Sequence, residues 1–264
     1  MKKKYLVIGS PIDHSLSPQL HNHWIKKNNI NAIYEKQKLS IGDLKGLISK
    51  MKTKEINGVN VTVPFKKEVI DFLDELTPEA QNSQSVNTIY LNNNKTIGHN
   101  TDIVGFELAV KDVKYDLVGK KILIIGAGGV VASIIVALNK MKVSQIILCN
   151  RTKSRTEKLK NLFNNLSIVN WGETPDFDMV INATSVGLKN KDELNLEFLK
   201  VQKGKFFYDL IYNPKETNFL KNAKKTGNEI ENGKKMFIYQ AAAAFKIWHG
   251  VEPEIDEETS NILD

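Results

Sequence analysis

One segment near the middle of the chain, KKILIIGAGGVVASIIVALNKMKVSQIILC, constrains the fold more than any other. An apolar run over residues 121–125 leads directly into the glycine-rich turn GAGG. A helical pattern and a second apolar run over residues 145–149 follow. Short apolar runs separated by a helix are typical of parallel strands that are buried on both faces. The segment therefore predicts a strand–turn–helix–strand unit within an α/β sheet.

The turn itself has the pattern of a dinucleotide-binding loop. Gly126 would permit a tight turn, and Gly128 would let the backbone approach a pyrophosphate at the N-terminus of the next helix. The third glycine of the usual pattern is replaced by Val131, whose larger side chain must fit between helix and strand. An ordinary strand-to-helix turn is the alternative interpretation.

The residues after the second apolar run discriminate between two nucleotides. NAD-binding folds usually place an Asp or Glu there to hold the ribose 2′-hydroxyl. This chain has Asn150, Arg151, Thr152 and Arg155 instead. These two arginines are the only ones among its 37 basic residues, and the others are lysines. Guanidinium groups form forked, charge-assisted hydrogen bonds with phosphate. The pattern favours NADP over NAD.

Strand and helix patterns also alternate in the rest of the chain. We expect strands over residues 5–9, 32–39 and 58–63, helices over residues 17–27, 41–52 and 68–76, and a hairpin made by residues 87–92 and 95–100. The first helix would have Ser17 as its N-cap and Pro18 at its first helical position. Past the glycine turn, we expect two further strands within residues 177–185 and 205–212 and a helix over residues 233–250.

These elements predict an α/β protein of two domains with the binding site in the cleft between them. Residues 1–102 plus 234–264 would form a discontinuous substrate-binding domain with a mostly parallel sheet, because the last helix would return to pack on it. Residues 103–233 would form a Rossmann-type domain that binds NADP.

The segment GVNVTVPFKK places a lysine just beyond a strand. Period two puts the valines on one face and Asn60 and Thr62 on the other, and Pro64 ends the ladder. Lys66 would then lie past the carboxyl end of the strand, where α/β proteins bind ligands. Lys67 beside it should be an ordinary surface residue.

Other polar residues should gather at the same edge. Ser15 and Ser17 follow the first strand, Asn87 begins the hairpin, and Asp102 follows it. Each also has a structural interpretation: Ser17 as a helix cap, Asn87 in a turn, and Asp102 as the cap of a helix that starts near Val104. Together they favour a binding site.

Composition excludes several classes of function. No apolar run approaches the ~20 residues of a membrane helix, and MKKKYLVIGS reads as a first strand rather than a signal peptide. The lysines behind the net charge of +7 are scattered and residues 252–264 are acidic, so we expect no nucleic-acid partner. The single cysteine, Cys149, suits a cytoplasmic protein and reads as a buried filler. The five histidines show no metal-ligand spacing, and we expect no metal.

The chain resembles the shikimate dehydrogenase family over nearly its full length. The matching segments are SLSPQLHN, GVNVTVPFK, VNTI, GHNTD, GAGG, NRTKSR, NATSVG, YDLIYNP and NGKKMFIYQAAAAF with its following W-x-G. They occur in the family's order and spacing. The departures are Ile103 in place of a common glycine, Gln84 and Ser85 in place of Gly-Ala, and bulkier residues after GAGG. They bear on affinity and rate rather than on reaction type.

The resemblance implies NADPH-dependent reduction of 3-dehydroshikimate to shikimate, on the route to chorismate and the aromatic amino acids. Ser15 and Ser17 would bind the substrate carboxylate, with Tyr212 nearby. The substrate's ring hydroxyls would contact Thr62, Lys66, Asn87, Asp102 and Gln240. The nucleotide would contact Gly126, Ala127, Gly128, Gly129, Val130, Asn150, Arg151, Thr152, Arg155, Thr184 and Gly233.

The resemblance also makes Lys66 and Asp102 the catalytic pair. A ketone that receives hydride becomes an alkoxide unless a proton arrives, and a lysine supplies both a positive charge and a proton. A nearby carboxylate would keep Lys66 charged and aimed. We expect a monomer or weak homodimer.

Three alternatives stay open. The protein could be a related oxidoreductase that also oxidises quinate or that prefers NAD. A nucleotide-sensing binding protein could use the same fold, although it would have no use for Lys66 and Asp102. A methylene-tetrahydrofolate-type dehydrogenase shares the general architecture, but it does not explain SLSP, NVTVPFK and the Gln240 helix together.

Overall fold

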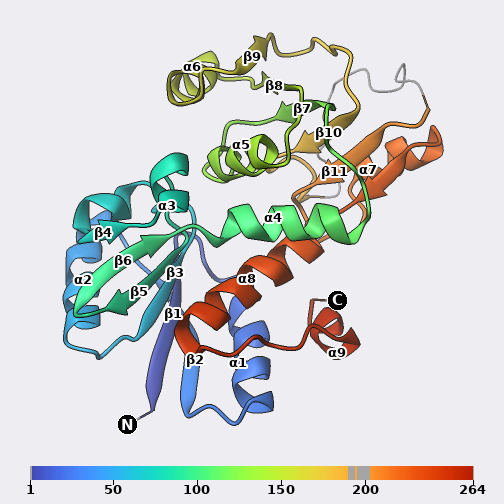
Figure 1. The fold of residues 1–264 in the computed structure, drawn as a ribbon. Coiled ribbons are helices and arrows are strands. Elements are labelled where there is room, and N and C mark those ends of the chain that lie inside the picture. Colours follow the sequence, from blue (N-terminus) through green and yellow to red (C-terminus); the bar gives the residue numbers. More distant parts are fainter. Residues whose placement is uncertain (1, 190–193, 195–202, 264) are drawn as a thin grey trace. The chain divides into compact units, whose positions relative to one another are not determined.

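The structure is a computed structural model that describes residues 2–189, 194 and 203–263 (Figure 1). The chain divides into two compact units. The first unit comprises Met1–Phe106 and Phe237–Asp264, and the second comprises Glu107–Met236. The chain leaves the first unit within helix α4 (Thr101–Asp112) and re-enters it within helix α8 (Lys234–His249).

The first unit contains a six-stranded sheet in the order β2-β1-β3-β5-β6-β4. Its strands are β1 (Lys3–Gly9), β2 (Ala32–Lys38), β3 (Gly58–Val61), β4 (Glu75–Leu76), β5 (Thr88–Asn92) and β6 (Lys95–His99). β1 pairs in parallel with β2 and β3, and β4 pairs in parallel with β6. The predicted hairpin, β5–β6, is antiparallel and joins β3 in antiparallel fashion, so the sheet is mixed.

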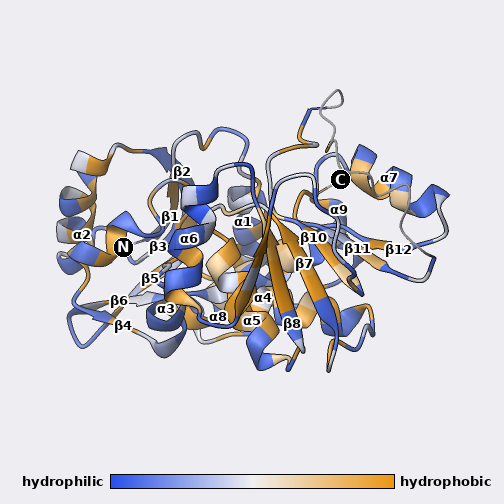
Figure 2. Cartoon of the chain, turned by 90° about the horizontal axis from the view of Figure 1, so that it is seen from above, coloured by the Kyte–Doolittle hydropathy of each residue, from blue (hydrophilic) through white to orange (hydrophobic). Residues whose placement is uncertain are grey.

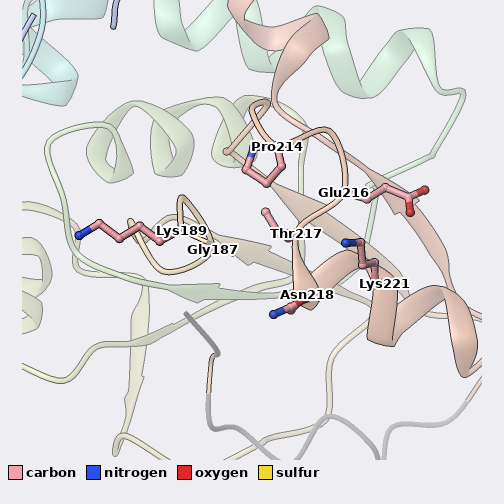
Figure 3. Close-up of a pocket in the computed structure, with 7 residues that line it drawn as sticks. All are labelled: Gly187, Lys189, Pro214, Glu216, Thr217, Asn218 and Lys221. Atoms are coloured by element: carbon pink, nitrogen blue, oxygen red, sulfur yellow. The ribbon is translucent and has the colours of Figure 1, made fainter. Parts of the chain in front are cut away.

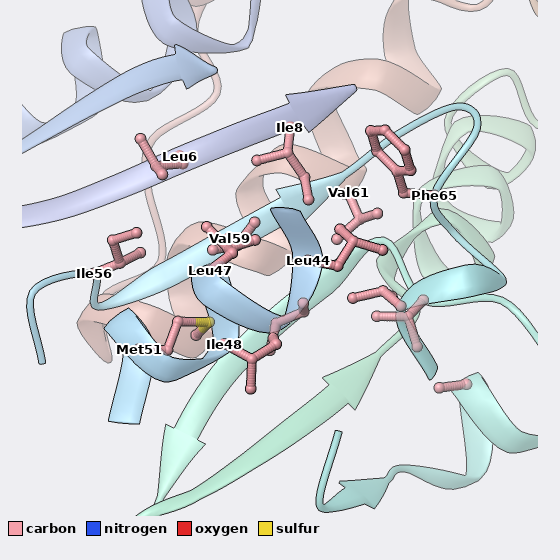
Figure 4. Packing of buried hydrophobic residues seen from close by; sticks show 14 residues of the cluster. Leu6, Ile8, Leu44, Leu47, Ile48, Met51, Ile56, Val59, Val61 and Phe65 are labelled. Atoms are coloured by element: carbon pink, nitrogen blue, oxygen red, sulfur yellow. The ribbon is translucent and has the colours of Figure 1, made fainter. Parts of the chain in front are cut away.

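Period-two alternation along β1 fills two cores, one on each face of this sheet. Leu6 and Ile8 pack with Val59, Val61 and the apolar side of helix α2 (Leu44–Lys52), as Figure 4 shows. Tyr5 and Val7 point the other way and pack with α1 (Ser17–Lys27) and α8. Both faces of the central strands are therefore covered.

Short helices complete the first unit. They are η1 (Ile41–Asp43), η2 (Glu68–Phe72), α3 (Pro78–Ser83) and α9 (Glu257–Asn261). A helix over residues 68–76 was predicted, and this is wrong: the segment is the 3₁₀ helix η2 followed by strand β4. Asp74, just before β4, exchanges hydrogen bonds with Thr96 of β6, and this tertiary pairing overrides the local helical pattern.

The second unit contains an all-parallel sheet in the order β12-β11-β10-β7-β8-β9. Its strands are β7 (Lys121–Ile125), β8 (Gln145–Cys149), β9 (Leu166–Val169), β10 (Met179–Asn182), β11 (Phe206–Asp209) and β12 (Glu229–Glu231). Its helices include α5 (Val131–Lys140), α6 (Lys153–Leu162) and α7 (Asn218–Lys225). Figure 2 shows β7, β8 and β10 as predominantly apolar, as expected for buried parallel strands.

The strand order of the second unit reverses direction at β7. The chain fills one side of β7 with β8 and β9 and then the other side with β10, β11 and β12. This is the doubly wound order, in which ligands bind at the carboxyl ends of the strands beside the reversal. The predicted α/β class with a Rossmann-type unit is confirmed. Within the described ranges, no helix is both long enough and apolar enough to traverse a bilayer.

Candidate active site

The loops after β1 and β3 meet at one edge of the first sheet. Because these strands are parallel, both carboxyl ends lie there, and the Ser10 N–H donates to the Val63 carbonyl at 3.0 Å. A Cβ atom on Gly9 would lie 2.5 Å from the Thr62 methyl, so only glycine allows this approach. The β1 loop continues into Ser15, whose Oγ accepts the Ser17 N–H at 3.3 Å.

The prediction that Ser17 is an N-cap is wrong. Helix α1 already includes Ser17, its N-cap is Leu16, and Pro18 is the second helical residue. The oxygen that accepts a backbone N–H at this helix start belongs to Ser15. Ser17 is buried, and its side chain is hydrogen bonded to the phenol of Tyr34.

Lys66 lies in the turn between β3 and η2. Phe65, which is buried, anchors this turn, and the Lys66 carbonyl accepts the Val86 N–H at 2.8 Å. The Lys66 Nζ is 2.5 Å from Asp102 Oδ2, and the two side chains are only 12% and 8% exposed. Lys67, by contrast, is exposed.

Asp102 lies in the first turn of α4 and is not its cap. The helix starts at Thr101 rather than near Val104, because side-chain carbonyls accept its first N–H groups: Asn87 Oδ1 from Thr101 at 2.7 Å and Asn100 Oδ1 from Asp102 at 3.1 Å. The Asp102 carboxylate is thereby left for other partners. Its Oδ1 accepts from Asn87 Nδ2 at 2.9 Å, and its Oδ2 accepts from Lys66.

Gln240 reaches the same cluster from α8. Its Oε1 is 3.4 Å from Asn87 Nδ2, while its Nε2 donates to the Phe237 carbonyl at 2.9 Å. Lys66, Asp102, Asn87 and Gln240 thus form one hydrogen-bonded cluster within the first unit. Tyr212 belongs to the second unit, where burial raises the pKa of its phenol.

Sequence reasoning missed the polar residues that lie behind this cluster. Tyr34 on β2, Asn60 on β3 and Thr88 on β5 are buried and hydrogen bonded to one another. The only signal in the sequence was a polar Asn60 within an apolar strand. Its partners depend on the order β2-β1-β3-β5, which no local pattern gives.

The glycine turn of the second unit has the geometry of a dinucleotide site. Gly126 has a φ of +113°, and a Cβ there would lie 2.7 Å from the Ala183 carbonyl oxygen, so glycine is required. Among the described residues other than the adjacent turn residues, none comes within 4 Å of where a Cβ on Gly129 would lie, and a Cβ on Gly128 would meet the Ala183 carbonyl oxygen at 3.9 Å. Val131 is fully buried in the α5 core, which is how the chain accommodates it.

The residues expected at the ribose follow β8. Asn150 Nδ2 donates to the Thr152 carbonyl at 2.9 Å, which shapes the turn into α6. Arg151 and Arg155 are both exposed there, and no acidic residue stands between them. This set of donors without a carboxylate fits a phosphorylated ribose.

Two other residues expected at the nucleotide have structural roles. Thr184 donates through Oγ1 to Asn182 Oδ1 at 2.8 Å, which fixes the loop after β10. A Cβ on Gly233 would lie 2.1 Å from the Leu210 carbonyl oxygen, so packing alone requires glycine there.

A buried carboxylate joins the loops at this end of the second sheet. Asp209 accepts from Thr217 Oγ1 at 2.6 Å, Asn182 Nδ2 at 3.0 Å and the Ile211 N–H at 3.0 Å. Burial raises the pKa of Asp209, although these hydrogen bonds oppose the shift. The methyl of Thr217 faces Gly187. A cavity of about 100 Å³ adjoins them (Figure 3), lined by Gly187, Lys189, Pro214, Glu216, Thr217, Asn218 and Lys221.

Cys149 ends β8 and is 1% exposed, which confirms the predicted buried filler. Burial raises the pKa of its thiol, so little of it is present as the nucleophilic thiolate. The part of the chain that the structure describes contains no group of three or more His, Cys, Asp and Glu side chains that could hold a metal ion.

The second unit is doubly wound and carries a dinucleotide turn, and the first unit carries a largely buried lysine–carboxylate pair. Together these features define a nicotinamide-dependent dehydrogenase. Family models agree with this class. Residues 7–89 match the shikimate dehydrogenase substrate binding domain, residues 107–217 match shikimate / quinate 5-dehydrogenase, and residues 235–257 match the shikimate 5'-dehydrogenase C-terminal domain. The chain belongs to the shikimate dehydrogenase family.

Individual relatives match this chain over all or nearly all of its length. The NADP(+) shikimate dehydrogenase of Pelagibacter ubique is 58% identical over 264 residues, which is 100% of both chains. A crystal structure of a shikimate dehydrogenase in complex with NADP+ superimposes with a TM-score of 0.93 at 36% identity and covers 99% of this chain and 94% of that one. The crystal structure of the Thermus thermophilus enzyme in complex with NADP(H) and shikimate superimposes with a TM-score of 0.90 at 30% sequence identity. It covers 99% of this chain and 98% of that one.

Proposed function

We propose that the chain catalyses the reversible, NADPH-dependent reduction of 3-dehydroshikimate to shikimate, a step toward chorismate and the aromatic amino acids. Family membership across both units supports the reaction. The NADP(+) named for the 58% identical relative and the shikimate and NADP(H) bound in the Thermus thermophilus enzyme support the substrate and cofactor. We also propose a role for each residue of the site.

The single observation that carries those roles is the buried pair of Lys66 and Asp102. A buried ion pair contributes little net stability, because desolvation of the two charges offsets their attraction. Such a pair at the carboxyl ends of β1 and β3 is therefore better explained by a reaction than by folding.

In the proposed mechanism, Lys66 moves a proton. Bound NADPH supplies a hydride to the ketone carbon of the substrate. The ketone oxygen then takes a proton from Lys66 Nζ, so the C=O group becomes CH–OH and Lys66 becomes neutral. In the oxidative direction Lys66 removes the hydroxyl proton. Asp102 Oδ2 accepts a hydrogen bond from Lys66 Nζ and so keeps this side chain in place.

The remaining polar groups of the first unit bind and orient the substrate. Ser15 and Ser17 hold the carboxylate through hydroxyl and helix-terminal N–H groups. Thr62, Asn87 and Gln240 hold the ring hydroxyls. Asn87 and Gln240 are already within hydrogen-bond reach of each other, which preorganises that side of the site.

Residues of the second unit hold the nucleotide. The turn from Gly126 to Val130 receives the pyrophosphate, and Arg151 with Arg155 receives the 2′-phosphate. Thr184 and Gly233 border the site, and Tyr212 assists near the carboxylate. We further propose a cytoplasmic monomer or weak homodimer that binds neither nucleic acid nor membranes.

The test is the near-ultraviolet absorbance of reduced nicotinamide with purified protein and shikimate, with NADP⁺ and NAD⁺ run in parallel and quinate as a second substrate. We expect reduction of NADP⁺ with shikimate and much slower reduction of NAD⁺. Equal rates with quinate would broaden the substrate class. Folded protein that binds NADPH but reduces neither nucleotide would contradict the proposal and favour a nucleotide sensor.

A further inference from the structure

A buried chain of hydrogen bonds runs through the first sheet and ends on the Asp102 carboxylate. Tyr34 OH lies 2.6 Å from Asn60 Oδ1, and Asn60 Nδ2 lies 3.1 Å from Thr88 Oγ1. Thr88 Oγ1 lies 3.0 Å from Asn87 Oδ1, and Asn87 Nδ2 lies 2.9 Å from Asp102 Oδ1. All five residues are at most 7% exposed.

Backbone groups fix the direction of this chain. Asn60 Nδ2 faces the Asn87 carbonyl at 3.0 Å, which can only accept, so Asn60 Oδ1 must face Tyr34 and the phenol must donate. Asn87 Oδ1 faces the Thr101 N–H at 2.7 Å, which can only donate, so Asn87 Nδ2 must face Asp102. Neither amide can be turned over without placing two donors or two acceptors together.

Along this path each hydrogen bond is donated in the direction of Asp102, and Thr101 Oγ1 lies beside the path, 3.2 Å from Thr88 Oγ1 and 2.8 Å from Asn87 Nδ2. Tyr34 donates to Asn60, Asn60 to Thr88, Thr88 to Asn87, and Asn87 to the carboxylate. Hydrogen bonds aligned in one direction polarise one another in a low-dielectric interior, so each strengthens the next. Burial raises the pKa of the Tyr34 phenol well above its usual value, which keeps the first donor protonated.

We propose that Tyr34, Asn60 and Thr88 are positioning residues that, through Asn87, hold the Asp102 carboxylate in the orientation that pairs with Lys66. The proposal rests on the function proposed above for Lys66 and Asp102. None of the three residues is expected to touch the substrate. They act on the site only through the side chains that do.

The test combines a labelling measurement with kinetics. Thr88→Val and Tyr34→Phe each remove one hydroxyl from the chain and keep the shape of the side chain. Tyr90→Phe on β5 is the matched control, because among the described residues its hydroxyl has no hydrogen-bond partner. Acetic anhydride would label Lys66 and Lys67 on one peptide, and mass spectrometry would give the ratio of their rates.

We expect the Lys66 to Lys67 labelling ratio to rise in Thr88→Val and Tyr34→Phe by about threefold or more, the factor that one ordinary hydrogen bond is worth. In shikimate oxidation, kcat should fall by about three- to tenfold in both variants, and in Thr88→Val KM should change by less than about twofold. Tyr34→Phe also removes the hydrogen bond between the phenol and the Ser17 side chain, so Thr88→Val is the variant that separates kcat from KM. In an Asp102→Asn background, Thr88→Val should cause no further loss of kcat. Tyr90→Phe should change neither quantity.

An unchanged labelling ratio in both variants would overturn the proposal, and so would losses of kcat that simply add to that of Asp102→Asn. The labelling arm needs no turnover. A wild-type protein that is inactive with shikimate would therefore contradict the proposed function, while the labelling ratios would still decide whether the chain of hydrogen bonds holds the pair.

Discussion

At the scale of single residues, Lys66 and Lys67 are neighbours with opposite surroundings. Lys66 is 12% exposed and paired with a carboxylate, while Lys67 is exposed. Their sequence context is the same, so the end of β3 and the turn around Phe65 decide which of them faces Asp102. A chain with 35 lysines among its 37 basic residues thus offers a matched internal control.

We expect Lys66→Ala to lower kcat for shikimate oxidation by ~10²–10⁴-fold, the usual value of a positioned acid or base. Lys67→Ala should leave the rate within about twofold of wild type. Lys66→Arg keeps the charge beside Asp102 but cannot release a proton, and it should also be slow. Steady-state rates with circular dichroism as a folding check would show this, and equal losses at both positions would refute it.

At the scale of helices and strands, Gly58 at the start of β3 fixes how α8 lies on the first sheet. A Cβ on Gly58 would lie 2.4 Å from the Trp248 indole nitrogen. That nitrogen donates to the Ile89 carbonyl at 3.1 Å, and the ring packs against Tyr5, so the indole has no room to yield.

Gly58→Ala should therefore destabilise the protein by about 1–3 kcal/mol, as overpacking does in a filled core. Gly46 is the matched control: it lies in α2, and outside the helix's own backbone no described residue comes within 4 Å of its Cβ position. Gly46→Ala should stabilise by up to about 1 kcal/mol, because alanine is the better helix former. Urea unfolding would measure both, and a stable Gly58→Ala variant would mean that α8 can shift.

Sequence patterns predicted the central strands better than the edges. The runs at β7 and β8 were predicted with their observed bounds, because a strand buried on both faces must be apolar throughout. β4, β9 and β12 were missed, and all three are edge strands of two to four residues. Their conformation comes from hydrogen bonds to a neighbouring strand, which leave no periodic signal.

The candidate site shows the same division. Residues that stand at strand ends, such as Lys66 and Asp102, could be predicted because parallel strands bring their carboxyl ends together. Tyr34 could not, since its contact with Asn60 crosses β1 and depends on the strand order. The sequence pattern also could not decide whether Ser15 or Ser17 accepts a backbone N–H at the start of α1. Moving the first residue of the helix by one position changes which of the two serines does so.

At the scale of the whole molecule, buried His21 makes stability depend on pH. His21 is fully buried, stacks on Tyr34 with ring centroids 4.2 Å apart, and has no hydrogen-bond partner for either ring nitrogen among the described residues. Burial, and secondarily His249, lowers the His21 pKa from 6.5 to about 3. Burial, followed by Lys3, also lowers the pKa of His249, to about 4.

Because the folded protein binds this proton less readily than the unfolded chain, the contribution of His21 is present above pH ~6.5 and is lost as the pH falls toward ~3. We expect it to cost roughly 2–3 kcal/mol of unfolding free energy between pH ~6.5 and ~4.5. Urea unfolding across this range should show a flatter profile for His21→Leu. Exposed His14→Leu is the control and should follow wild type, and a parallel profile for His21→Leu would refute the assignment.

The path of the chain through α8 sets an order of assembly during synthesis. The core around Tyr5, Leu20 and Trp24 needs Ile238, Ala241 and Phe245, which leave the ribosome more than two hundred residues later. The sheet of the second unit is complete with β12, before those residues emerge. During synthesis, the N-terminal part of the first unit therefore keeps an uncovered apolar face until α8 has been made. The first unit begins to be synthesised first but completes its folding last.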